Sequence, residues 1–234
     1  MKLLPIVALA LFASSAFSAD QYNFKLIGFS KDNKYVAFAE SVNQDGSGHG
    51  VAVVSVVDVK ANNLIKKADH RDEGLNDEGG SEAVALKAAI AKANLAKFGI
   101  VTSNQGEVLI DRRPTDASTI LDTAFKIHPY MHSTQFSLDI KELPAKSEQC
   151  YDMGEPKMLK LTLKSKNDPQ TVNLVMQEDK SLPKSRGCAL GYGVSKVIRS
   201  GNALVVIINK SSPGFEGPDH DFMAITAEIK LDEI

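Results

Sequence analysis

The chain has 234 residues, a formal net charge of −2 and no tryptophan. This nearly balanced charge gives no electrostatic reason to expect nucleic acid or anionic lipid as a partner. After residue 18 no apolar run is long enough to cross a bilayer, so we expect no membrane span.

The first eighteen residues have the layout of a secretory signal peptide. Met1-Lys2 provides a positive start, residues 3–12 are predominantly apolar, and Ala16-Phe17-Ser18 fits the small-x-small pattern of a cleavage site. We expect cleavage after Ser18 or Ala19. The mature product, residues 19–234, is then expected to be a single β-rich domain that is periplasmic or secreted.

Strand patterns dominate the mature chain. Residues 51–59 are β-branched and nearly all apolar, as expected of a strand covered on both faces. Turn sequences at residues 166–169 and 199–202 predict antiparallel hairpins on either side of each turn. The expected strands lie near residues 24–27, 35–39, 51–59, 108–110, 135–140, 158–163, 171–176, 193–198, 203–208 and 222–231.

One segment, residues 81–98, predicts a helix. Ser81 fits the N-cap and Gly99 fits the position that closes the helix. Its apolar residues form two stripes, one through Val84 and one nearly opposite through Leu86, so we expect this helix to pack between layers. The acidic stretch before it, residues 66–80, predicts an exposed loop.

Cys150 and Cys188 are the only cysteines of the chain. Disulfides persist outside the cytosol. Closing a loop of this length would stabilise the fold by about 4 kcal/mol in the chain-entropy model. We expect a structural disulfide, with two unpaired thiols or a catalytic thiol as the alternatives.

The loop near residues 216–221 is the main candidate binding site. Carboxylates beside an imidazole suit either a divalent metal or acid-base chemistry. If the first and last hairpins are neighbours, the glycine-rich connection at residues 43–50 reaches the same end of the fold. The alternative is a solvated hairpin loop. The candidate binding residues are Asp45, His49, Glu216, Asp219, His220 and Asp221.

Other chemical motifs are weak. His128 and His132 have the i,i+4 spacing of helical metal ligands, but no Glu follows either histidine and no third ligand is apparent. The chain contains neither a G-x-S-x-G elbow nor a glycine-rich nucleotide-binding motif. We therefore assign no catalytic residue, metal ligand or cofactor.

Three segments resemble known sequences. The segment Gly28-Phe29-Ser30-Lys31-Asp32-Asn33-Lys34-Tyr35-Val36-Ala37-Phe38 resembles the turn-strand motif of TolB-type propeller blades. Together with residues 44–48 and the closing segment 212–225, it is similar to the signatures of a bacterial family of predicted secreted proteins of unknown function. The resemblance implies an exported domain with no assigned reaction, ligand or partner.

The sequence therefore predicts a mainly β (α+β) fold. We expect antiparallel hairpins in two packed sheets or a partial propeller-like array, with one α-helix near residues 81–98. The favoured function is a non-enzymatic binding or interaction module, with a small ligand or an envelope protein as partner. The alternative is a metal-assisted hydrolase that uses the acidic and histidine loop near residues 216–221.

Overall fold

The computed structural model describes residues 19–75, 79–112, 124–127, 134–150, 153–166, 173–215 and 217–229. The proposed signal peptide, the turn after residue 166, His128, His132 and Glu216 lie outside these ranges. The described residues form three antiparallel sheets with one α-helix, which confirms the predicted mainly β class. The number of sheets is three rather than two.

The three sheets are named here by their place in the molecule. The first sheet has the strand order β4-β3-β2-β1-β5, the central sheet β13-β12-β11-β6 and the third sheet β10-β9-β8-β7. The strands of the first sheet are β1 (Asn23–Ser30), β2 (Tyr35–Asn43), β3 (Gly50–Asp58), β4 (Asn63–Asp72) and β5 (Ile100–Val101). Those of the central sheet are β6 (Glu107–Asp111), β11 (Gly191–Ser200), β12 (Ala203–Pro213) and β13 (Pro218–Glu228). Those of the third sheet are β7 (Ala124–Ile127), β8 (Thr134–Pro144), β9 (Lys157–Lys166) and β10 (Asn173–Glu178).

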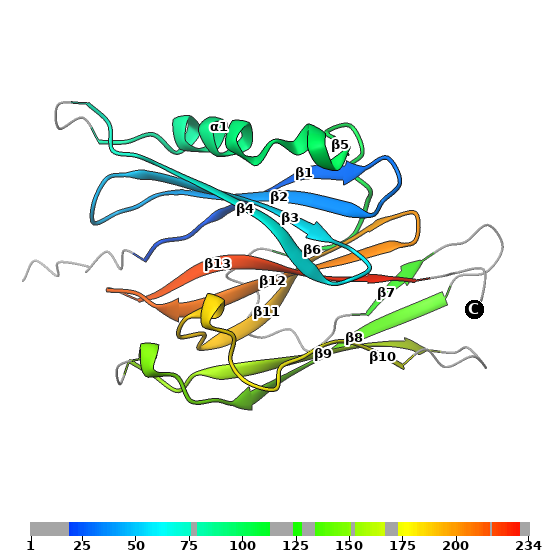
Figure 1. Cartoon of the computed structure of the whole chain (residues 1–234). Helices are drawn as coiled ribbons and strands as arrows, with labels where there is room; N and C mark the ends of the chain where they lie inside the picture. The colour runs from blue at the N-terminus through cyan, green and yellow to red at the C-terminus, as the bar shows by residue number, and fades with distance from the viewer. Residues whose placement is uncertain are drawn as a thin grey trace, which may run out of the picture.

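The molecule is a stack of four layers: the helix, the first sheet, the central sheet and the third sheet (Figure 1). The central strand β12 shows why its sequence is continuously apolar. Val205 and Ile207 pack against the first sheet, whereas Val206 and Ile208 pack against the third. A strand covered on both faces needs apolar side chains at successive positions.

The predicted hairpins are present. Strands β9 and β10 pair, as do β11 and β12, and both pairs are antiparallel. The segment Gly28–Phe38 lies in the β1–β2 hairpin of the five-stranded first sheet, and nothing in this arrangement shows a propeller blade. The two short strands β5 and β7 carry too few residues to give a clear pattern, and the sequence did not predict them.

The α-helix covers the outer face of the first sheet. It comprises α1 (Glu82–Ala93), which ends at Asn94 in the left-handed conformation before the short helix η1 (Leu95–Phe98). The Ser81 side chain caps α1, as predicted. The prediction that the helix packs between two layers was wrong. Helix α1 buries only the face formed by Ala85, Ala89 and Ala93, and it leaves Val84 52% exposed. None of the described helices is long and apolar enough to cross a membrane.

The predicted loop at residues 66–80 begins as a strand. Residues 66–72 belong to β4, which pairs with β3 and forms one edge of the first sheet. Polar and charged side chains are common on edge strands because they discourage pairing with other chains. The polarity of residues 66–72 therefore reflects their edge position, whereas residues 73–75 and 79–80 lie outside the strands.

Candidate functional site

The two glycine-rich connections meet at one end of the fold through Asp20. The backbone N–H of Asp20 donates to Asp219 Oδ1 over 2.9 Å. The Asp20 carboxylate accepts hydrogen bonds from the backbone N–H of Asp45 and from the Gln44 side chain, both at 3.2 Å. The structure thus brings Asp45 and Asp219 to the same end, where each makes a bond that holds the first described residues in place.

The two predicted histidines do not converge on a common site. His49 is half-buried, its backbone N–H donates to Ser47 Oγ, and no partner of its Nδ1 lies among the described residues. His220 Nδ1 lies 2.7 Å from Asn209 Oδ1, and burial lowers the pKa of the imidazole. A neutral His220 whose ring N–H donates to the amide oxygen of Asn209 has a structural role. Within the described ranges, no group of three or more His, Cys, Asp or Glu side chains is arranged to hold a metal ion.

Asp221 points to the opposite face of the sheet from His220, because consecutive strand residues face opposite sides. It lies opposite Lys210 in the β12–β13 ladder, and Lys210 Nζ is 2.9 Å from Asp221 Oδ2. Asp221 Oδ1 is buried and has no hydrogen-bond donor among the described residues. Burial raises the pKa of Asp221, although Lys210 opposes this effect.

A second carboxyl, which the sequence did not predict, lies close to Asp221. Glu40 is on β2, shares its face with Phe38 and is only 8% exposed. Its Oε1 accepts a hydrogen bond from the backbone N–H of Phe222 on β13. Burial raises the pKa of Glu40 to about 8, and the nearby Asp221 carboxylate acts in the same direction. The sequence signal was a charged residue at the inward-facing position of an apolar strand, two residues after Phe38.

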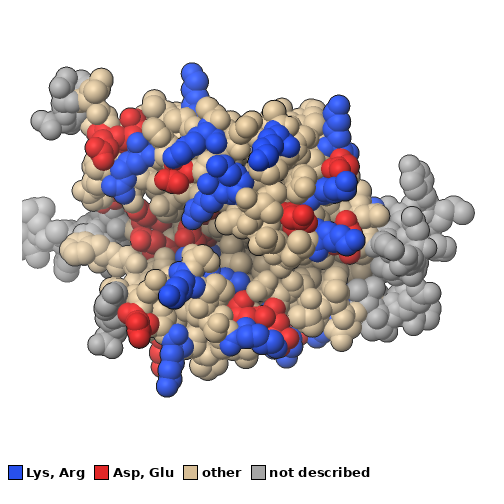
Figure 2. Space-filling model, viewed as in Figure 1, with Lys and Arg blue, Asp and Glu red and all other residues tan. Residues whose placement is uncertain are grey.

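Glu40 and Asp221 line a cleft of about 410 Å³. The cleft lies where the outer strands of the three sheets, β4, β13 and β10, come together at one side of the stack. Figure 2 shows acidic side chains gathered along a hollow between the upper and lower parts of this face, with lysine and arginine side chains above and below it. The first sheet contributes Phe38, Glu40, Ser55 and Lys67, and β13 contributes residues 221–224.

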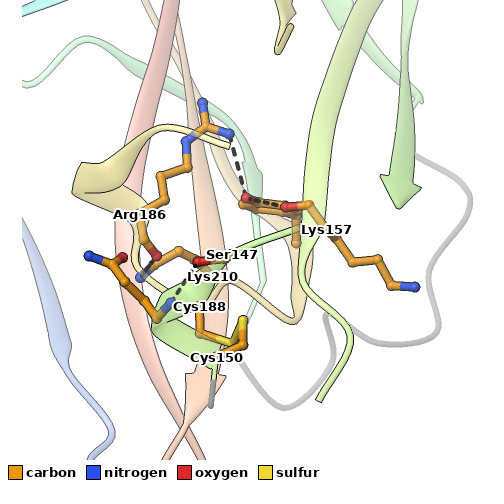
Figure 3. Close-up of a disulfide and its surroundings, with 8 residues drawn as sticks. Ser147, Cys150, Lys157, Arg186, Cys188 and Lys210 are labelled. Carbon is orange, nitrogen blue, oxygen red and sulfur yellow. Dashed lines mark hydrogen bonds between the residues drawn. A yellow bond between two sulfur atoms is a disulfide. The ribbon is translucent and has the colours of Figure 1, made fainter. Parts of the chain in front are cut away.

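The remaining wall comes from the segment that contains the short helix η4 (Lys184–Arg186). Arg186 forms a buried ion pair with Asp179, with Nη2 3.0 Å from Oδ1, and its backbone carbonyl accepts a hydrogen bond from Lys210 at 3.3 Å. Two residues later, Cys188 forms a disulfide with Cys150 of helix η3 (Glu148–Cys150) (Figure 3). The predicted cysteine pairing is therefore present in the structure, and it holds this wall of the cleft.

Within the described part of the chain, the buried cations of the cleft have ion-pair partners, whereas its buried carboxyl oxygens lack some of their hydrogen-bond donors. Lys210 is paired with Asp221 and Arg186 with Asp179. Lys67 has no ion-pair partner within the described residues, but it is exposed at the cleft surface. The buried acceptors are less well matched, because Glu40 receives one hydrogen bond and Asp221 Oδ1 receives none from the described residues. Buried acceptors without donors favour a ligand that donates hydrogen bonds.

Comparison with known proteins agrees with the sequence resemblance. No protein of curated function matches the chain. The family described as "Predicted secreted protein (DUF2259)" matches residues 37–228, from within β2 to the end of β13. This match covers most of the chain, and the chain therefore belongs to that family of predicted secreted proteins.

Proposed function

We propose that this chain is an exported, non-enzymatic binding module that holds a small polar ligand in the cleft between β4, β13 and helix η4. Export follows from the signal-peptide pattern of residues 1–18 and accords with the family description. Removal of the leader after Ser18 or Ala19 would leave the new N-terminus beside Asp219, which already accepts the Asp20 N–H.

The observation that carries this proposal is the burial of Glu40 in the cleft wall. Glu40 is 8% exposed as a residue, so its carboxyl group loses most of its hydration, and one backbone N–H replaces only part of it. A ligand that donates to the remaining carboxyl oxygens of Glu40 and Asp221 would offset this cost. Buried ionisable groups with shifted pKa values are common at binding sites.

The size of the cleft favours a small molecule over a protein surface. Its volume of about 410 Å³ lies within the range of roughly 300–1,000 Å³ typical of small-molecule sites. The hydrolase alternative has less support. It depends on the acidic and histidine loop, where the His220 ring is bonded to Asn209.

A screen with a blocking variant tests the proposal. The mature protein is screened by thermal shift against a panel of amino acids, short peptides, polyamines, sugars and dicarboxylates. Ser185→Trp places a bulky side chain at the cleft wall, whereas Ser181→Trp alters another exposed serine of the same segment that does not line the cleft. We expect stabilisation by at least one compound in the wild type and in Ser181→Trp, and its loss in Ser185→Trp. No stabilising compound, or equal stabilisation of both variants, would contradict the proposal.

A further inference from the structure

Strand β13 is the outer strand of the central sheet, so every second residue turns its backbone N–H and C=O away from β12. The structure identifies these as the even-numbered residues. The N–H of His220 donates to the Asp20 carbonyl, that of Phe222 to Glu40, and that of Thr226 to the Asn62 side chain. In each case the acceptor comes from outside the central sheet.

Between His220 and Thr226, Ala224 is the remaining residue of this series. The ladder between β12 and β13 is regular from Ala203 to Pro213, so the N–H and C=O of Ala224 also point away from β12. Ala224 lines the cleft, and no hydrogen-bond partner for its backbone is found among the described residues. The cleft therefore contains one free donor and one free acceptor of a strand edge.

The same edge already binds a strand segment in one defined orientation. Gln21 forms a parallel bridge with His220. The His220 N–H donates to the Asp20 carbonyl at 3.0 Å, and the Tyr22 N–H donates to the His220 carbonyl at 3.1 Å. A three-residue segment thus satisfies one edge residue of β13, with its amino end toward the start of β13.

We propose that the cleft binds the amino-terminal end of a short extended peptide, which pairs with Ala224 in the orientation that Asp20–Tyr22 adopts at His220. This inference rests on the proposed binding function and names its ligand class. The carbonyl of the first ligand residue accepts from the Ala224 N–H, and the N–H of the third donates to the Ala224 carbonyl. Addition of a strand to an open sheet edge is a common mode of peptide recognition.

The charges of the cleft explain why the bound end carries an ammonium group. In parallel pairing, the amino end of the ligand lies toward Phe222, where Glu40 approaches from the first sheet and Asp221 lies one residue earlier on β13. An ammonium group has three donors and no acceptor. Lys210 and Arg186 already form ion pairs with Asp221 and Asp179, so neither requires an anionic ligand.

The two side chains that cover the neighbouring edge positions limit the ligand to a short segment. Glu40 occupies the edge at Phe222 and Asn62 occupies it at Thr226. These positions are four residues apart, which corresponds to about 13 Å along a strand. About three extended residues fit this length.

The test uses trialanine as the probe, titrated into the mature protein by isothermal calorimetry at pH 7. We expect binding of trialanine and about tenfold weaker binding of N-acetyl-trialanine, because acetylation removes the charged donors. Trialanine methylated on the nitrogen of its third residue should also bind several-fold more weakly, since it cannot donate to the Ala224 carbonyl. Equal binding of all three peptides would overturn the proposal.

Two variants of the protein separate peptide pairing from general effects on folding. Ala224→Pro removes the edge N–H, which a strand edge tolerates because the ladder to β12 does not use it. Glu40→Gln retains an oxygen that accepts from Phe222 but cannot ionise, whereas a bound ammonium group stabilises the carboxylate form of Glu40. We expect about tenfold weaker trialanine binding in each variant. Wild-type affinity in both would overturn the inference.

The outcomes distinguish this inference from the proposed function. If another compound of the panel binds and Ser185→Trp blocks it, while trialanine does not bind, the peptide inference fails and the binding function stands. If neither trialanine nor any panel compound responds to Ser185→Trp, both fail.

Discussion

At the residue scale, the most informative side chain is Glu40. It occupies a position that the β2 pattern reserves for apolar residues, and its carboxyl is held by the backbone of another sheet. Burial without an opposing cation in direct contact makes its folded-state pKa higher than its unfolded value of 4.5. The folded protein therefore binds more protons than the unfolded chain between pH 4.5 and about 8.

Glu40→Gln tests this linkage. In the wild type, the raised pKa of Glu40 makes the free energy of unfolding fall as the pH rises from 4.5 to about 8. Asp221 adds a slope of the same sign, whereas Lys67 and Lys210 oppose the shift at Glu40. Because each pKa unit corresponds to about 1.4 kcal/mol, the variant should be more stable than the wild type at pH 8 by a few kcal/mol.

Urea unfolding at pH 5 and pH 8 measures the difference. Glu107→Gln, at an exposed position of β6, is the control and should keep the wild-type dependence on pH. A Glu40→Gln variant with the wild-type slope would show that Glu40 ionises normally in the folded state.

At the element scale, α1 shows how a sheet selects the face of a helix. The helix contains larger apolar side chains, yet it buries three of its six alanines against Ala37, Ala39 and Ala52 of the first sheet. Small side chains on both surfaces allow the helix and sheet to approach closely. The predicted stripes, through Val84 and through Leu86, contained neither Ala85 nor Ala89. A hydrophobic pattern favours the larger apolar side chains and does not detect this close fit between small ones.

Ala89→Leu is expected to destabilise the fold. Ala89 is fully buried, so the added carbons would force α1 away from the first sheet at a cost of about 1–3 kcal/mol. Ala83→Leu makes the same change at an exposed position of α1 and should alter stability by less than about 0.5 kcal/mol. Chemical denaturation of both variants measures the difference, and equal stabilities would contradict close packing at Ala89.

At the scale of the whole molecule, Asn62 connects all three sheets. It lies in the turn between β3 and β4 with a left-handed φ of 48°. Its Nδ2 donates to the Met176 carbonyl of β10 at 3.1 Å, and its Oδ1 accepts from the Thr226 N–H of β13 at 2.8 Å. One side chain thus fixes the outer strands that form the cleft.

Asn62→Gly keeps the backbone conformation and removes these bonds. At roughly 1 kcal/mol per hydrogen bond, the loss should be about 2–3 kcal/mol. Asn94→Gly is the matched control, because Asn94 has a φ of 52° and its side chain makes no capping bond. Thermal unfolding should show a lower midpoint for Asn62→Gly alone. The same midpoint in both variants would show that Asn62 is not a structural link.

The amino-acid sequence by itself determined the mainly β class, most strands, the helix with its Ser81 cap and the pairing of Cys150 with Cys188. These features follow from local periodicity, turn chemistry and the number of cysteines. Only the tertiary structure decided the stack of three sheets, because continuous apolar strands show that both faces are covered but not by which layer. It also decided the cleft: Glu40 and Asp221 are 181 residues apart in sequence. They come close because the edge strand β13 of the central sheet lies against the face of the first sheet that carries Glu40.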